Sequence, residues 1–145
     1  MNGVTIRYEL PIDQLTERLR KLAEFTVDDL KTDIGEYMIG QIQDRFDHQQ
    51  LWAGTAMPQS KAARARGGQT LIDHRLLYKS YVYNKTSEGL EIGSASPYAR
   101  IHHFGGETGR QGHRFIMMAR PVLGINNQDE RHIGDLILNE LRGIA

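Results

Sequence analysis

The chain has 145 residues, of which 39% are hydrophobic and 25% charged, so it is long enough to form one globular domain with its own core. Its 18 Lys and Arg residues balance 18 Asp and Glu residues, and this zero net charge argues against a general nucleic-acid-binding protein, which is usually basic. Cysteine is absent, which excludes disulfides and thiolate metal sites, and the apolar runs are too short to span a membrane.

The first part of the chain is predicted to form a strand followed by a helix. Apolar and polar residues alternate over residues 4–10, which is typical of a half-buried strand and unlike the basic and apolar blocks of a signal peptide. Pro11 ends this strand because its ring fixes φ and removes a backbone donor. Residues 13–25 then place apolar side chains on one stripe at helical spacing, so we expect an amphipathic helix there.

A second and longer helix is predicted over about residues 27–48. Its apolar residues recur at intervals of four, and Thr26 with Asp29 resembles a helix-capping pair. Gly35 and Gly40 fall inside this pattern, and each costs about 1 kcal/mol of helix stability relative to alanine. Two interpretations are open: the glycines let another element pack closely, or the helix tolerates them.

No periodic pattern is found over residues 49–70, and we predict a flexible loop there. This loop carries a basic patch, Lys61, Arg64 and Arg66, within a stretch that could form a short helix. Such cations could contact DNA phosphates, but three of them make a weak footprint and a solvated loop is the default interpretation.

The next part of the chain is predicted to form a β-hairpin. A helical turn near residues 76–77 precedes a strand near residues 81–83. Residues 86–89, Thr-Ser-Glu-Gly, have the composition of a hairpin turn, and residues 90–94 are the returning strand.

The stretch over residues 96–124 organises the second half of the chain. Residues 96–97, Ser-Pro, are suited to begin a short helix, and residues 105–106, Gly-Gly, are suited to end it. We expect residues 105–114, which are glycine-rich and charged, to form an assembly arm. The apolar residues 115–123 are then expected to anchor this arm to the domain, beginning with a buried strand or extended segment.

A last helix is predicted over about residues 127–141, with Asn127 and Glu130 as its capping pair. Asp129 and Glu130 lie in its first turn, where negative charge interacts favourably with the helix dipole. The order of elements predicts a single α+β domain over residues 1–145. In it, two N-terminal helices and the C-terminal helix pack in two layers with a small, mainly antiparallel sheet.

Short motifs of the second half of the chain stand in a fixed order that resembles the phage virion morphogenesis family, which includes tail-completion proteins of Mu-like phages and prophages. The motifs are Gly93-Ser94, Tyr98-Ala99, Ile101-His102, Phe104-Gly105 and the sequence ARPVLG of residues 119–124. Upstream, Leu71, Asp73, Leu76 and Ser80 match a further family segment. His74 and Arg75 replace its Thr-Gly pair, which removes the glycine that would make a tight turn there.

The resemblance implies a structural protein without enzymatic activity or cofactor, found in the virion and, during assembly, in the host cytoplasm. It implies tail completion or head-tail joining through self-association into a ring of six-fold symmetry and contact with tail tube or head connector proteins. Arg110, Arg114 and Arg120 could pair with carboxylates of a neighbouring subunit. The motif residues expected to serve assembly are Tyr98, His102, Phe104, Gly105, Arg120, Pro121 and Gly124.

Two other classes of function stay open from the sequence. A small metal-dependent hydrolase or nuclease could use Asp73, His74, His102 and His103, although no ligand spacing such as H-E-x-x-H is present. A nucleic-acid-binding protein could use the basic loop over residues 61–66, with passing contact to DNA as a weaker form of the same role.

Overall fold

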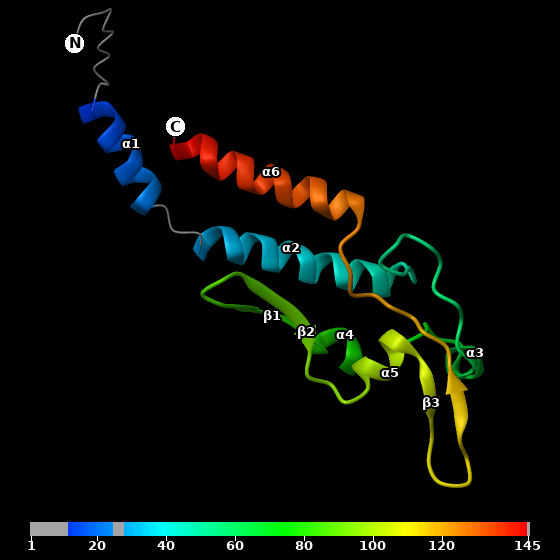
Figure 1. Cartoon of the computed structure of the whole chain (residues 1–145). Helices are drawn as coiled ribbons and strands as arrows, with labels where there is room; N and C mark the ends of the chain where they lie inside the picture. Colours follow the sequence, from blue (N-terminus) through cyan, green and yellow to red (C-terminus); the bar gives the residue numbers. More distant parts are fainter. Residues whose placement is uncertain (1–11, 25–27, 145) are drawn as a thin grey trace, which may run out of the picture.

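The computed structural model describes residues 12–24 and 28–144, so the strand predicted over residues 4–10 and the capping residue Thr26 lie outside the described part. The described residues form six helices and two antiparallel hairpins, which confirms the α+β class (Figure 1). In chain order the elements are α1 (Ile12–Glu24), α2 (Asp28–Asp47), α3 (Lys61–Arg66), α4 (Leu76–Ser80), β1 (Tyr81–Lys85), β2 (Leu90–Ser94), α5 (Ala99–Phe104), β3 (Gly106–Thr108), β4 (Phe115–Met117) and α6 (Asn127–Ile144). None of the described helices has the length and apolar character that crossing a membrane requires.

Among the described residues, the strands form two separate antiparallel sheets of two strands each, where one small antiparallel sheet was expected. The first hairpin, β1–β2, has the turn that the sequence predicted: the Thr86 N–H donates to the Gly89 carbonyl at 2.9 Å, and the Gly89 N–H donates to the Thr86 hydroxyl at 3.0 Å. The second hairpin, β3–β4, pairs Gly106 with Met117 and occupies the region that was expected to be an open loop. It projects from the rest of the molecule (Figure 1).

Helix α2 is the central element, with the first hairpin packed on one side and α6 on another (Figure 1). Its regular spacing of apolar residues, one about every four positions, directs one stripe into the core. The buried core consists of Ile42, Phe46, Met57, Tyr81 and Val122. The core therefore joins α2 to β1, to the segment after α2 and to the ARPVLG motif.

The two glycines of α2 have different surroundings. A Cβ atom added to Gly35 would lie 2.5 Å from the ring of Tyr83 on β1, so this glycine allows the hairpin to pack closely against the helix. A Cβ atom added to Gly40 would have no atom within 4 Å. The close-packing interpretation is therefore confirmed for Gly35 and is wrong for Gly40.

We expect opposite effects from alanine at these two positions. Gly35→Ala should lower the free energy of unfolding by about 1–2 kcal/mol, since the clash with Tyr83 outweighs the gain in helix propensity. Gly40→Ala should raise it by about 0.5–1 kcal/mol, since only the propensity changes. Urea denaturation of both variants measures the two effects, and a stabilised Gly35→Ala variant would contradict the packing shown by the structure.

Helix α1 does not cover a sheet, although two N-terminal helices were expected to do so. Its apolar residues Leu15 and Leu19 are 42% and 56% exposed. The helix lies away from both hairpins (Figure 1). The amphipathic pattern correctly predicted a helix, but neither of the two described sheets lies against Leu15 and Leu19.

The segment over residues 49–70 is tied to the core at several points. Met57, Ala63 and Thr70 are buried, and an isolated bridge joins Gln50 to Ala56. The short helix that the sequence allowed is α3, which Ser60 caps by accepting a hydrogen bond from the Ala63 N–H at 3.1 Å. The flexibility of this segment stays a prediction.

Limited trypsin digestion tests that flexibility. We expect the first cuts at Lys61, Arg64 or Arg66, because a helix of 6 residues is marginal by itself and can open locally. Mass spectrometry of the early fragments identifies the sites. Earlier cleavage at Arg18 or Arg20 in α1 would contradict the prediction.

The residues that replace the family's Thr-Gly pair make a tight turn without glycine. His74 and Arg75 have φ values of 56° and 59°, in the left-handed region that most residues avoid. Arg75 is also the N-cap residue that directly precedes α4, and its guanidinium lies 5.1 Å from the centre of the Tyr78 ring. This cation–π contact offsets part of the backbone strain.

Candidate assembly surface

The two main sequence motifs meet at the end of α5. Gly105 ends the helix as predicted, with φ 69°, and its N–H donates to the Ile101 carbonyl at 2.7 Å. The Arg120 N–H donates to the His102 carbonyl at 2.7 Å, which fastens the second motif to the first. A Cβ atom at Gly105 would lie 2.7 Å from the Met117 carbonyl oxygen, so only glycine fits this crossing.

The Arg120 side chain makes its hydrogen bonds within the subunit. Its side chain is buried, and its Nε donates to the Pro58 carbonyl at 2.7 Å. Burial lowers the pKa of the guanidinium, and its hydrogen-bond partners are carbonyl groups. Arg120 therefore links the motif to the segment before α3, and the expectation that it could pair with a neighbouring subunit is wrong for this conformation.

His102 lines a cavity of about 300 Å³ between α3, α4, α5 and β4. Its Nδ1 atom is buried and has no hydrogen-bond partner among the described residues. Burial lowers the pKa of this imidazole, and the positive charge of Arg120 lowers it further. The ring is therefore neutral at pH 7. Apolar groups share the cavity wall with it, among them Leu71, Leu76, Leu77, Tyr98 and Met117.

This environment predicts a pH dependence. The folded pKa of His102 lies below the unfolded value of about 6.5, so the unfolded state binds more protons below that pH. The contribution of His102 to stability is full above pH 6.5 and falls as the pH is lowered towards the folded pKa. NMR titration should give His102 a pKa below the ordinary value of about 6.5, and His102→Gln should weaken the loss of stability between pH 7 and pH 5.5. A His102 pKa at or above the ordinary value would contradict the assignment.

The end of the ARPVLG motif packs around Trp52. The Trp52 N–H donates to the Pro121 carbonyl at 3.0 Å, and Val122 is buried in the core. A Cβ atom at Gly124 would lie 2.4 Å from the Trp52 ring, so a larger residue does not fit. Pro121 and Gly124 thus serve the folding of the subunit.

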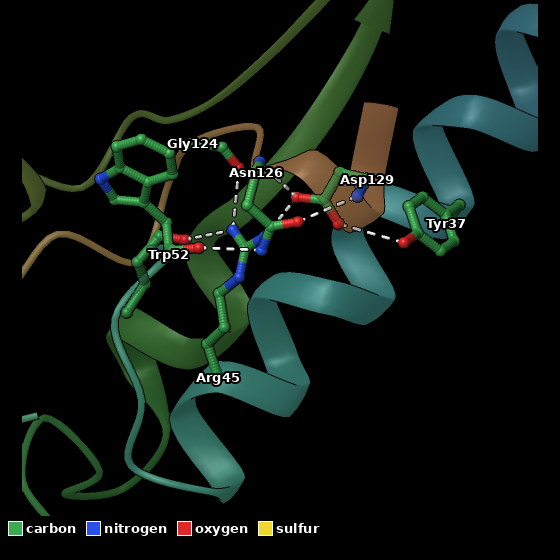
Figure 2. A network of polar contacts seen from close by, with 7 residues as sticks. Tyr37, Arg45, Trp52, Gly124, Asn126 and Asp129 are labelled. Carbon is green, nitrogen blue, oxygen red and sulfur yellow. Dashed lines mark hydrogen bonds and ion pairs between the residues drawn. The ribbon is translucent and has the colours of Figure 1, made fainter. Parts of the chain in front are cut away.

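A buried ion pair holds α6 to α2 and was missed by the sequence reasoning (Figure 2). The Arg45 guanidinium donates to a carboxylate oxygen of Asp129 at 2.5 Å, and the side chains are 6% and 0% exposed. The other guanidinium nitrogen donates to the Val122 and Gly124 carbonyls at 2.7 and 3.0 Å. Arg45 therefore joins α2, α6 and the ARPVLG motif.

The second oxygen of Asp129 accepts a hydrogen bond from the Tyr37 hydroxyl at 3.0 Å. Burial and this hydrogen bond raise the pKa of Tyr37 to about 12. The capping pair of α6 is also one residue earlier than predicted: Asn126 Oδ1 accepts from the Asp129 N–H at 2.9 Å, and Asp129 accepts from the Asn126 N–H at 3.1 Å. Asp129 is thus a buried partner of Arg45 and not merely a charge at the helix dipole.

The remaining candidate ligands do not converge. Asp73 and His74 are exposed and 3.6 Å apart, and His103 packs edge-on against Phe104. Within the described ranges, no group of three or more His, Cys, Asp or Glu side chains lies close enough to hold a metal ion.

The basic patch lies on α3. Lys61 and Arg64 are exposed. Arg66 donates to the carbonyls of Gln69 and Ile72 at 2.6 and 3.1 Å, so its guanidinium is used within the loop.

Most apolar residues of β4 and of the position after it are exposed, so the prediction of a buried strand is wrong; Met117 alone among residues 115–118 is half-buried. Phe115, Ile116 and Met118 are 52%, 77% and 55% exposed. The β3–β4 hairpin projects from the rest of the molecule (Figure 1), and Met117 at its base lines the cavity that holds His102. The anchor begins at Arg120, and residues 106–118 together form the arm, a term used below for these residues. An exposed group of this kind is typical of a protein–protein interface.

Two motif residues add to this exposed surface. Tyr98 and Phe104, at either end of α5, are 67% and 68% exposed. Of the motif residues, these two side chains are the most available to a partner, whereas Arg120 and Val122 are buried. In the sequence, both residues were identified as members of the motifs Tyr98-Ala99 and Phe104-Gly105.

Comparison with known proteins gives the family. The sequence profile of the phage virion morphogenesis family matches residues 10–142. This chain belongs to the phage virion morphogenesis family. A relative, the Mu-like prophage FluMu G protein 2 of Haemophilus influenzae strain Rd, is 37% identical over 76 residues, which cover 52% of this chain and 54% of the relative. The aligned region thus spans about half the length of that relative, and no solved structure matches the chain.

Membership of the phage virion morphogenesis family confirms the resemblance and supports a role in phage virion assembly. It also supports association with the virion and a structural role in place of an enzymatic one. In this member of the family, the ARPVLG motif makes contacts inside the subunit. The arm and the ends of α5 carry exposed apolar side chains.

Proposed function

We propose that this protein acts in tail completion or head-tail joining, through self-association and binding to tail tube or head connector proteins. The observation that carries the proposal is the exposed apolar arm, on which Ile116 is 77% exposed. The hydrogen bond from the Arg120 N–H to the His102 carbonyl fastens the end of this arm to α5. A projecting apolar hairpin is unfavourable in water unless a partner covers it. Head-to-tail contacts between copies would close into a ring, and six-fold symmetry is the form that we expect.

Within such a ring, the exposed Lys61 and Arg64 are available for passing contact with DNA. This contact would depend on charge and not on base sequence, so it should weaken steeply with salt. A DNA mobility-shift assay at low and high salt tests this part of the proposal.

The experiment that tests the main proposal changes one exposed residue. Ile116→Asp should leave circular dichroism and the melting temperature nearly unchanged, because the side chain is exposed, but should abolish ring formation and binding to purified tails. Electron microscopy and sedimentation report both activities. Val82→Asp is the matched control, since Val82 is also an exposed apolar strand residue, 58% exposed, but lies on the first hairpin. Normal assembly by Ile116→Asp would contradict the proposal.

A further inference from the structure

Charge is divided unevenly between two parts of the molecule, although the net charge is zero. Helices α2 and α6 together contain 10 Asp and Glu but 4 Lys and Arg, a net charge of −6. Residues 48–124, from the end of α2 to the end of the ARPVLG motif, contain 10 Lys and Arg but 4 Asp and Glu, a net charge of +6. These two parts of the chain therefore carry net charges of opposite sign.

The arm combines cations with apolar side chains. Arg110 near its tip is exposed, and the Arg114 guanidinium donates to the Glu107 carboxylate at 3.2 Å and to the Gly109 carbonyl at 2.9 Å. Arg114 directly precedes the exposed Phe115 and Ile116 in the chain. A partner suited to this surface offers carboxylates together with apolar groups.

Helices α2 and α6, together called the α2–α6 layer below, offer both carboxylates and apolar side chains. Carboxylates at exposed positions run along the length of α2: Asp29, Asp33, Glu36, Asp44 and Asp47. On α6, Ile137, Leu138 and Leu141 are 37%, 48% and 42% exposed. The layer thus complements the arm in charge and shares its apolar character.

We propose that the arm of one copy docks on the α2–α6 layer of a second copy. The arm and α1 lie at opposite ends of the molecule (Figure 1). Because the arm points away from α2 and α6, it does not dock on the layer of its own subunit. The contact is therefore head-to-tail, and it closes into a ring where the rotation between copies permits. This inference rests on the proposed self-association and adds which two surfaces meet.

A charge-exchange experiment tests the pairing. The arm variant carries Arg110→Glu with Gln111→Glu, and the layer variant carries Asp33→Lys with Glu36→Lys; all four positions lie outside the buried core. Each variant alone should associate at least about tenfold more weakly than the wild type, because like charges then face each other. An equimolar mixture should regain association, since the reversed arm meets the reversed layer and the unchanged arm meets the unchanged layer.

Sedimentation velocity measures association, and circular dichroism confirms that each variant folds. Glu88→Lys with Glu91→Lys, at exposed positions of the first hairpin and its turn, is the control that changes charge by the same amount as the layer variant without touching either surface. If a double variant fails to fold, Arg110→Glu and Glu36→Lys are tested as single substitutions. Association of the wild type should also weaken between 50 mM and 500 mM salt.

The outcomes separate this inference from the proposed function. A wild-type protein that stays monomeric at all concentrations would overturn both. A wild type that associates, with variants that associate equally well, would overturn the docking of the arm on the layer and leave self-association standing. Variants that fail alone and also fail when mixed would show that the two surfaces do not face each other, and would overturn the docking as well.

Discussion

Asp129→Ala should lower the free energy of unfolding by about 3–5 kcal/mol, because it leaves the Arg45 guanidinium buried without a negative partner. The Tyr37 hydroxyl and the Asn126 N–H lose their acceptor in the same variant. Urea denaturation followed by circular dichroism measures the effect. A loss this large is a substantial fraction of the stability of a domain of this size.

Glu130→Ala is the matched control for Asp129→Ala. Glu130 is the next residue in the first turn of α6, but its side chain is exposed. If both carboxylates acted only through the helix dipole, as the sequence suggested, the two variants would each lose about 0.3–1 kcal/mol. Equal losses would therefore contradict the role of Asp129 in the buried network.

Gly105→Ala is the second change with a large expected effect, a loss of about 2–5 kcal/mol. With φ 69° and ψ −172°, Gly105 occupies a backbone region that is essentially confined to glycine. The added methyl group would also lie 2.7 Å from the Met117 carbonyl and 2.8 Å from the Ala119 nitrogen, and backbone atoms cannot move aside as a flexible side chain can. Thermal and urea unfolding measure the loss.

Gly112→Ala separates the two causes. Gly112 also has a positive φ, 81°, but a Cβ atom there would have nothing within 4 Å. Its substitution should cost only the backbone strain, about 1–2 kcal/mol. A Gly105→Ala variant no less stable than Gly112→Ala would show that the crossing between Gly105 and residues 117–119, at the end of β4, is looser than the structure indicates.

The local elements of this protein followed from local sequence patterns. The spacing of apolar residues predicted α2, α4, the first hairpin and α6 to within a few residues, because helical and strand periods depend on near neighbours. Gly105 was correctly predicted to end α5, since the requirement for a left-handed backbone is a property of one position. The ordered motifs over residues 93–124 were sufficient to indicate the family.

The sequence by itself therefore determined the α+β class, most helix boundaries and the family, whereas the tertiary structure decided which side chains are covered. An apolar pattern predicts that Ile116 and Leu19 will be buried, but it does not tell whether a neighbouring element of the same chain lies over them. Within the described part of the chain, both side chains are more than half exposed. Asp129 is a polar residue that the tertiary structure buries. A carboxylate in the first turn of a helix is usually solvated, but Asp129 is buried because it pairs with Arg45, 84 residues away in the chain. Contacts over such separations arise from the packing of α6 on α2, so no local pattern in the sequence records them.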